Sequence, residues 1–211
     1  MAGYHDSRFV YDAERDVVWR AIIAYLLRAG VIQSGGDVLD LGAGYAHFIN
    51  NVPARRRFAM DVVPEMAKHA AAGVVALAQS CHAPWPLEPS SLDAVLASNL
   101  LEHLSREELD RTVDEMRRVL RPGGRVVVIQ PNYRYAYREY FDDYTHVAVF
   151  SHVSLADYFV SRSFKTVRIE PKFLPFSMKS RLPKSRRLID WYLRSPVRPL
   201  ARQMLVVMEK P

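Results

Sequence analysis

The chain has 211 residues, of which 49% are hydrophobic and 25% charged, and this length and composition suit a single globular domain with a substantial core. No apolar run is long enough to span a membrane, and the first residues lack the basic-then-apolar layout of a secretion signal. The single cysteine, Cys81, excludes an internal disulfide, so we expect a cytoplasmic location. The net charge of +6 is local, because residues 172–198 hold eight basic residues and one acid while the rest of the chain holds 21 basic and 22 acidic residues. This distribution does not indicate a stable nucleic-acid partner.

The hydrophobic pattern predicts strands that alternate with helices along the chain. Such alternation is typical of an α/β fold, here a Rossmann-like, seven-stranded, mostly parallel sheet with helices on both faces. The predicted helices cover about 12–29, 45–52, 64–72, 105–120 and 153–161. The predicted strands cover 37–41, a run that ends at Asp61, and about 74–78, 91–97, 125–130, 165–169 and 203–208.

The first predicted strand runs directly into a glycine-rich turn, and residues 38–44 read VLDLGAG. Glycine permits backbone angles, and a close approach of a ligand, that a side chain would block. Asp61 follows Asp40 at the distance where a Rossmann-type fold hydrogen-bonds a ribose. A dinucleotide site would have glycine at position 47, where the chain has His47, and the lysine of a phosphate-binding loop is also absent. The turn therefore predicts a site for an adenosine without phosphates.

These residues resemble motif I of class I S-adenosylmethionine-dependent methyltransferases, and four further signatures follow in the family's order. They are Asp61 in place of the ribose-binding acid, APWP (83–86) followed by SLDAV (91–95), SNLLEHL (98–104) and LRPGG (120–124). The resemblance is dense over residues 37–131 and looser over 132–170. The chain departs from the family at Ala46, the position of the third glycine of motif I, and at Gln79 or Ser80, where an acid usually contacts the adenine amino group.

The resemblance implies S-adenosylmethionine as the cofactor. Asp40 would face its amino-acid portion, Asp61 its ribose hydroxyls, and the backbone of residues 42–44 its methionine end. An alternative interpretation is that Asp40 only caps a turn and Asp61 a helix N-terminus. The expected cofactor-binding residues are Asp40, Gly42, Ala43, Gly44, Asp61, Val62, Gln79, Ser80, Ser98 and Asn99.

The acceptor side is predicted from two histidines, because an alcohol is a poor nucleophile until a base or a metal helps to remove its proton. His103 follows the fourth strand, and Asp143 precedes His146 by three residues, close enough to orient an imidazole. We therefore expect His146, Asp143 and His103 to be catalytic, with the alternative that His146 bonds a backbone carbonyl and stiffens its segment. No tight metal-ligand spacing is present, so we assign no metal ligand. A divalent ion such as magnesium, held by Asp142, Asp143 and His103 or His146, remains an open alternative.

Residues 143–155 resemble the Asp-Pro-Thr-His…Leu stretch of methyltransferases that act on sugars and polysaccharide ends, with tyrosine in place of the proline. This resemblance implies an O-methyltransferase acting on a hydroxyl of a sugar, oligosaccharide or polysaccharide precursor. The alternatives are an N- or O-methyltransferase of another small molecule (an aminosugar, natural product or lipid intermediate) and a non-catalytic subunit that binds the cofactor. Aromatic side chains that could stack on sugar rings or pack a lid crowd the same segment, namely Tyr133, Tyr135, Tyr137, Tyr140, Phe141 and Tyr144.

The whole chain is predicted to be one methyltransferase domain. It comprises an N-terminal helical segment (1–30), a cofactor-binding core (37–171), a basic insertion (172–198) and a last strand (199–211). The insertion mixes its positive charge with apolar residues, so we expect a lid over the cofactor or the arm of a homodimer. A surface for an anionic acceptor, RNA or an anionic membrane remains open.

Overall fold

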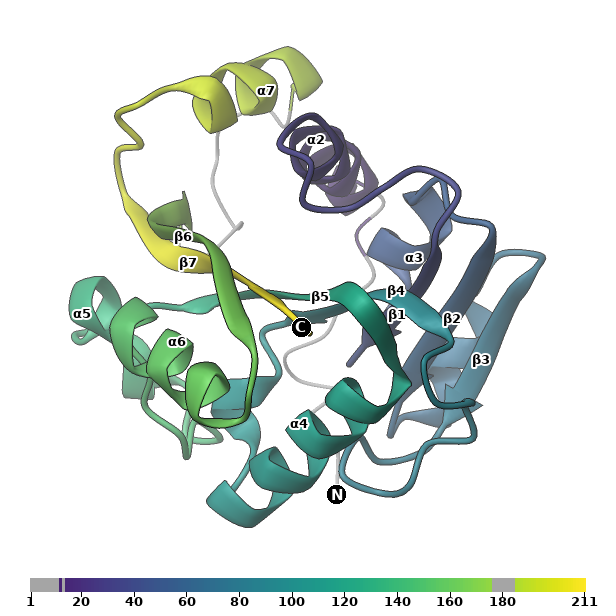
Figure 1. Cartoon of the computed structure of the whole chain (residues 1–211). Helices are drawn as coiled ribbons and strands as arrows, with labels where there is room; N and C mark the ends of the chain where they lie inside the picture. Colours follow the sequence, from purple (N-terminus) through teal and green to yellow (C-terminus); the bar gives the residue numbers. More distant parts are fainter. Residues whose placement is uncertain (1–11, 13, 176–184) are drawn as a thin grey trace, which may run out of the picture.

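The computed structural model describes residues 12, 14–175 and 185–211, which form a three-layer α/β structure around one sheet (Figure 1). The strand order is β3-β2-β1-β4-β5-β7-β6, and β7 is antiparallel to both of its neighbours while the other pairs are parallel. The prediction of a seven-stranded, mostly parallel sheet is confirmed. The strands are β1 (Asp37–Leu41), β2 (Arg56–Asp61), β3 (Val74–Ala78), β4 (Leu92–Ser98), β5 (Leu120–Pro131), β6 (Lys165–Pro175) and β7 (Ala201–Glu209).

Helices cover both faces of this sheet, as predicted (Figure 1). One face carries α2 (Glu14–Arg28), α3 (His47–Asn51) and α7 (Arg186–Arg194). The other carries α4 (Arg106–Val119) and α6 (His152–Ser161), with the short α5 (Tyr133–Ala136) beside them in Figure 1. Three short 3₁₀ helices complete the described chain, η1 (Pro64–Lys68), η2 (Leu101–His103) and η3 (Tyr140–Asp142).

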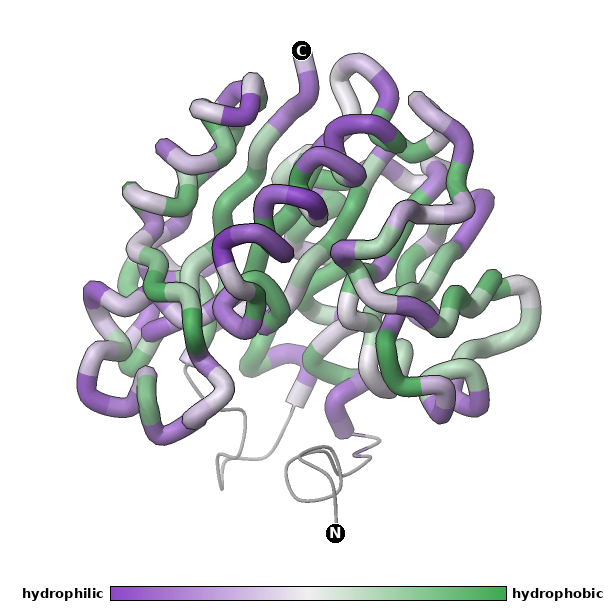
Figure 2. Tube along the Cα trace, turned by 90° about the horizontal axis from the view of Figure 1, so that it is seen from below, coloured by the Kyte–Doolittle hydropathy of each residue, from purple (hydrophilic) through white to green (hydrophobic). Residues whose placement is uncertain are grey.

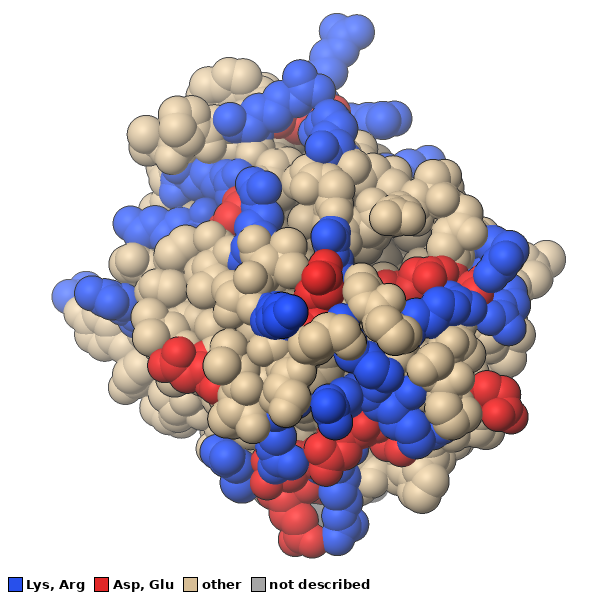
Figure 3. Space-filling model, in the orientation of Figure 1, with Lys and Arg blue, Asp and Glu red and all other residues tan. Residues whose placement is uncertain are grey.

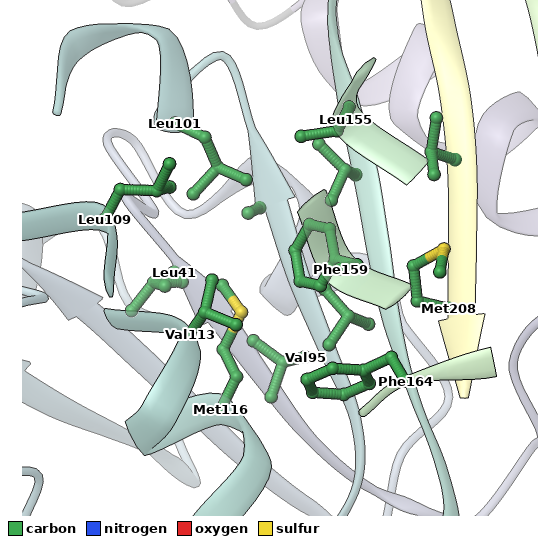
Figure 4. Close-up of a cluster of buried hydrophobic side chains, with 14 of the residues drawn as sticks. Leu41, Val95, Leu101, Leu109, Val113, Met116, Leu155, Phe159, Phe164 and Met208 are labelled. Carbon is green, nitrogen blue, oxygen red and sulfur yellow. The ribbon is translucent and has the colours of Figure 1, made fainter. Parts of the chain in front are cut away.

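Two hydrophobic clusters fill the space between the layers, one on each face of the sheet. A single strand contributes to both clusters because successive side chains point to opposite faces. Leu39 and Leu41 of β1 enter the cluster under α4 and α6, whereas Val38 enters the one under α2 and α3. Figure 4 shows the first cluster, in which Val113 and Met116 of α4 approach the sheet. Figure 2 shows the same pattern, with hydrophobic strands inside and hydrophilic turns on the exposed side of the helices. The central strand β1 is buried along its whole length, as expected of a strand covered on both faces.

The start of α4 follows its sequence signal. The Ser105 side chain accepts a hydrogen bond from the Glu108 backbone N–H, and the Glu108 carboxylate accepts one from Ser105 at 2.8 Å. These two bonds form a capping box, and its sequence pattern, serine followed three residues later by glutamate, is a local signal for the start of a helix. The helix ends at Val119, and the Pro-Gly-Gly turn lies inside β5, where pairing with β4 is irregular between Leu92 and Ala94. The predicted strand, 125–130, therefore begins later in the sequence than β5, which starts at Leu120.

Other boundaries differ where tertiary pairing outweighs local pattern. The helix expected over 64–72 is the short 3₁₀ helix η1, and the helix expected from residue 45 begins at His47. Strand β6 continues to Pro175, with register shifts against β7 after Glu170, so residues 172–175 belong to the sheet and not to an insertion. Residues 1–11, 13 and 176–184 lie outside the described residues, and with them parts of the predicted N-terminal segment and basic insertion.

The described end of the basic insertion forms α7, which packs on α2. Leu193 is buried with the residues of α2, and Arg28 pairs with Asp190 at 3.6 Å. In Figure 3, lysine and arginine side chains gather over α7 at the top of the molecule, whereas both charges mix over α4 at the bottom. The predicted lid or dimer role of the insertion stays a prediction. No helix among the described residues is long and apolar enough to cross a membrane.

The amino end of β1 is held by a buried carboxylate. Asp37 is fully buried, and its oxygens accept hydrogen bonds from Arg55 (3.0 and 2.6 Å), Arg56 (2.7 Å) and Arg121 (2.8 Å). These guanidinium groups hold the pKa of Asp37 far below its usual range. The cluster joins the starts of β1 and β2 to the turn that follows α4.

We expect the substitution Asp37→Asn to lower the free energy of unfolding at pH 7 by about 2–3 kcal/mol, because it removes the buried charge that three arginines share. Because the folded pKa is depressed, this stabilisation is present above a pH of about 4 and is lost as the pH falls. Urea unfolding at pH 7 and pH 3 measures both effects. The matched control is Asp114→Asn, an exposed partner of Arg162, which should cost under about 0.5 kcal/mol. Equal stabilities of the two variants at pH 7 would contradict the assignment.

Candidate functional site

The site lies where the strand order reverses, between β1 and β4. These strands pair in parallel, with Leu41 opposite Ala97, so the loops that leave their carboxyl ends are neighbours. Ligands of open α/β sheets bind in this crevice. The predicted cofactor residues come from the loops after β1, β2, β3 and β4, and the fold therefore brings them to one edge of the sheet.

The loop after β1 is fixed by its backbone. The N–H groups of Gly42 and Ala43 donate to the carbonyl of Met60 at 2.8 and 3.1 Å, which ties the loop to β2. Gly42 and Gly44 have φ of +71° and +52°, and Ala46 has 58°, all in the left-handed region that favours glycine. Ala46 therefore adopts a conformation that favours glycine, at a cost of about 1 kcal/mol.

The two glycines serve different ends. A Cβ on Gly42 would lie 3.1 Å from Cδ1 of Leu100, so this glycine lets the loop after β1 pack against the loop after β4. A Cβ on Gly44 would meet no atom within 4 Å, so the surface beside Gly44 is open to a ligand.

Asp40 is buried at the end of β1, with 4% of its surface exposed. Burial raises the pKa of its carboxyl to about 7, and the charge of Asp61 acts in the same direction, while a hydrogen bond from the backbone of Ile49 opposes them. Asp40 thus contacts the first turn of α3. Its raised pKa also means that a nearby positive charge would stabilise the ionised form.

Asp61 joins the loops after β1 and β2. Its Oδ2 accepts a hydrogen bond from the Gly44 N–H at 2.8 Å, and its Oδ1 accepts one from the Val63 N–H at 2.9 Å. A carboxylate offers about four lone-pair positions, so capacity remains for two ribose hydroxyls. The adjacent Val62 is 64% exposed, and its side chain can cover a ligand only from outside.

The residues after β3 and β4 make mostly local contacts. Gln79 donates from Nε2 to the carbonyl of Pro84 at 3.2 Å, and its side-chain oxygen is the atom that can accept a hydrogen bond from an amine. Ser80 Oγ lies 2.9 Å from a ring nitrogen of His82. Asn99 has φ of 49°, contacts Ser98 Oγ at 3.3 Å and accepts a hydrogen bond from Gln203 of β7 at 3.1 Å.

On the acceptor side, His103 ends η2 directly after the β4 loop. Its Nδ1 lies 2.9 Å from Thr145 Oγ1, and that hydroxyl donates to Asp143 Oδ1 at 2.6 Å. Thr145 therefore accepts from His103, which places the proton on Nδ1 and a lone pair on Nε2. Burial and the neighbouring His146 lower the pKa of His103, which keeps the ring neutral.

His146 is buried, and its Nδ1 lies 2.5 Å from the carbonyl oxygen of Tyr140. This is the backbone contact that the alternative interpretation expected. The ring centroids of His146 and His103 are 4.8 Å apart. The sequence pattern paired Asp143 with His146, whereas the hydrogen bonds link the carboxylate of Asp143 to His103 through Thr145. Spacing along the chain could not reveal this link, because it crosses from η2 to the segment after η3.

Glu102 is a residue that sequence reasoning missed. It is fully buried, and neither carboxylate oxygen makes a hydrogen bond. Burial raises the pKa of its carboxyl to about 8, against a smaller opposing effect of its own backbone amide. Its carbonyl accepts hydrogen bonds from Val147 (2.9 Å) and Ala148 (3.0 Å), which dock the loop after β4 on the segment after η3. The available signal was an acid inside the apolar run LLEHL, directly before His103.

Comparison with known proteins agrees with this geometry. Residues 39–128 match a family model described as a methyltransferase domain. A curated relative, a malonyl-[acyl-carrier protein] O-methyltransferase of Methylococcus capsulatus, is 29% identical over 168 residues. The match covers 70% of this chain and 60% of the relative, so the chain spans less than two thirds of that protein's length.

Solved structures share the fold over almost the whole chain. A methyltransferase described as a possible histamine N-methyltransferase, from Thermotoga maritima, has a TM-score of 0.67 at 20% identity and covers 97% of both chains. The N-methyltransferase NodS from Bradyrhizobium japonicum, solved with S-adenosylhomocysteine, has a TM-score of 0.64 at 15% identity, covering 100% of this chain and 94% of its own. The family model thus matches a methyltransferase domain at residues 39–128, and the solved structures confirm the predicted Rossmann-like methyltransferase fold.

Proposed function

We propose that this chain transfers the methyl group of S-adenosylmethionine to a hydroxyl of a sugar, oligosaccharide or polysaccharide precursor. The observation that carries the proposal is the chain of hydrogen bonds from His103 through Thr145 to Asp143, at the carboxyl edge of the sheet. It orients a neutral imidazole, a group that can help a hydroxyl acceptor to lose its proton.

The cofactor half of the proposal rests on the loops after β1 and β2. When bound, S-adenosylmethionine supplies a methyl group on a positively charged sulfur, already activated for transfer. The residues fit this group, because the open space beside Gly44 lies next to the carboxylate of Asp61, and Asp40 lies at the end of the same strand. Asp61 would hold the ribose and Asp40 would attract the amino-acid end.

On the acceptor side, this chain has to position a hydroxyl and help it to lose its proton. His103 is the proposed catalytic residue for that step, and Asp143 and Thr145 are positioning residues that act through it. Transfer forms an oxygen–methyl bond and breaks a sulfur–methyl bond, and the hydroxyl proton leaves to the base or to solvent. Alignment of acceptor and methyl group supplies much of the remaining rate enhancement.

A carbohydrate acceptor is supported by the aromatic side chains beside this histidine. Phe141 and Tyr144 are 56% and 76% exposed, in the segment that also carries Asp143 and Thr145. Aromatic faces of this kind stack on the apolar faces of sugar rings. Tyr140, in contrast, is fully buried and donates to the carbonyl of Ala148 at 2.6 Å, so its role is to pack the segment.

A second candidate acceptor is a carboxyl group carried on a lipid or acyl-carrier intermediate, and it is favoured by the name of the curated relative. A carboxylate is already ionised at neutral pH and needs no base. The two candidates therefore differ in their dependence on His103. The same surface would accept either, so kinetics must decide between them.

The first test compares Asp61→Ala with Asp61→Asn. We expect both to weaken S-adenosylmethionine binding, Asp61→Ala by about tenfold or more, because each loses charge-assisted acceptors for the ribose. Isothermal titration calorimetry measures the affinity, and thermal melting controls for the loss of the bond to Gly44. The control variant Asp142→Asn, an exposed acid of η3, should bind like the wild type. Unchanged affinity in a folded Asp61→Ala protein would refute the cofactor site.

The second test uses the pKa of Asp40. Since burial raises this pKa to about 7, the ionised fraction increases about tenfold between pH 6 and pH 8. Binding of S-adenosylmethionine, whose amino-acid end carries an ammonium group, should therefore tighten by up to about tenfold over this range. Asp40→Asn should bind more weakly and flatten the profile. Adenosine, which lacks the ammonium group, is the ligand control, and an identical pH profile for the variant and the wild type would exclude this role.

The third test measures methyl transfer to a panel of sugars by His103→Gln and by the control His82→Gln, whose ring lies on the loop after β3. We expect His103→Gln to reduce kcat about 10²-fold or more on a hydroxyl acceptor, with cofactor affinity unchanged. His82→Gln should keep normal turnover. Turnover that is indifferent to His103 would instead support a carboxylate or amine acceptor.

A further inference from the structure

The structure brings together three potential metal ligands, two of them buried, and one of the three, Glu102, was not among the ligands considered from the sequence. One carboxylate oxygen of Glu102 and one nitrogen each of His103 and His146 all lie within 4.8 Å of one another. Among the residues that the structure describes, this is the one such group of three or more, and neither Asp142 nor Asp143 belongs to it. The magnesium site considered from the sequence, with Asp142, Asp143 and His103 or His146 as ligands, therefore shares only its histidines with this group.

The first argument for a bound ion is the state of Glu102. A fully buried carboxyl that makes no hydrogen bond costs free energy in either protonation state, about 1–3 kcal/mol when neutral and more when ionised. Neighbouring residues of the chain such as Leu101 and Leu104 are hydrophobic and offer the carboxyl no hydrogen bond or charge. A cation beside the carboxylate would stabilise its ionised form.

The second argument is the orientation of the two imidazoles. Nδ1 of His146 can only donate to the carbonyl oxygen of Tyr140, and Nδ1 of His103 donates to Thr145, whose own proton goes to Asp143. Both rings are thereby fixed in the tautomer that leaves a lone pair on Nε2. Metal-ligating histidines are held in this way, with the other ring N–H bonded to a carbonyl, hydroxyl or carboxylate.

We propose that Glu102, His103 and His146 hold one divalent transition-metal ion. Two imidazoles and one carboxylate suit Mn²⁺, Co²⁺, Fe²⁺ or Zn²⁺ better than Mg²⁺, which prefers oxygen ligands. Bonds of about 2.0–2.2 Å in a tetrahedral site place the ligand atoms about 3.4 Å apart, so a pair at 4.8 Å must close by roughly 1.5 Å. The carboxylate oxygens of Glu102 have no hydrogen-bond partner that this movement would take away.

Three protein ligands leave coordination positions open, as in catalytic sites. An acceptor hydroxyl bound there would have a lowered pKa and would release its proton to solvent near neutral pH. With an ion present, His103 assists the acceptor as a ligand and does not take the proton itself. This role of the ion rests on the proposed function, whereas the binding of the ion does not.

The test is cation binding by the full chain without a polyhistidine tag. Calorimetry with Mn²⁺, Co²⁺, Zn²⁺ and Mg²⁺, and the visible absorption of Co²⁺, report affinity and ligand type without any acceptor. We expect about one equivalent of Co²⁺ or Zn²⁺ per chain, at least tenfold weaker binding by Glu102→Gln and by His146→Gln, and weaker binding of Mg²⁺. The ion should also raise the melting temperature of the wild type but not of Glu102→Gln.

The control variant distinguishes ion binding at Glu102, His103 and His146 from binding elsewhere on the chain. Asp142→Asn lies outside the cluster and should bind the ion like the wild type. Failure of the wild type to bind any of these ions, or equal binding by Glu102→Gln and Asp142→Asn, would overturn the proposal. S-adenosylmethionine affinity of each variant shows that it is folded. Methyl transfer that survives a chelator would support the proposed function and contradict a catalytic role of the metal. Ion binding without methyl transfer to any sugar would support the metal site and contradict the proposed function.

Discussion

The constraint on which the rest of the structure depends is the parallel pairing of β1 with β4 at the centre of the sheet. The connection after β1 leads to β2 on one side, whereas the connection after β4 leads to β5 on the other side. The two loops therefore diverge and leave a crevice between them at the carboxyl ends of β1 and β4. Gly42 then packs against Leu100, so the cofactor loop and the loop that carries Glu102 and His103 support each other. The methyl donor and the acceptor are proposed to meet along this line.

The buried carboxylates at the two ends of the sheet have different surroundings. At the amino end of the sheet, the carboxylate of Asp37 is shared by three arginines. At the carboxyl end, Asp40 and Glu102 are buried with raised pKa values and little compensation. Buried groups with shifted pKa values are typical of functional sites. We propose that a cationic ligand completes each of them, the ammonium of the cofactor at Asp40 and a metal ion at Glu102.

The comparisons match a methyltransferase domain at residues 39–128 and leave the acceptor open. The two solved structures are named N-methyltransferases and the curated relative an O-methyltransferase, so these names do not agree on one acceptor atom. We propose that the acceptor is bound by residues 132–150, which lie beyond the stretch matched by the family model. In this chain that segment supplies Asp143, Thr145 and His146 close to His103.

The sequence by itself determined which segments form the strands and where the glycine-rich loop after β1 lies. The reason is that apolar strands, the glycines of the VLDLGAG turn and the capping box at Ser105 are local signals. It also placed Asp40, Asp61 and His103 at strand ends. Only the tertiary structure decided the extent of β6, the pairing of Asp143 with His103 and the burial of Glu102 beside two histidines. These features depend on contacts between residues some 40 positions apart, such as the hydrogen bonds from Val147 and Ala148 to Glu102, and no local pattern encodes which distant segment will fold back onto a strand end.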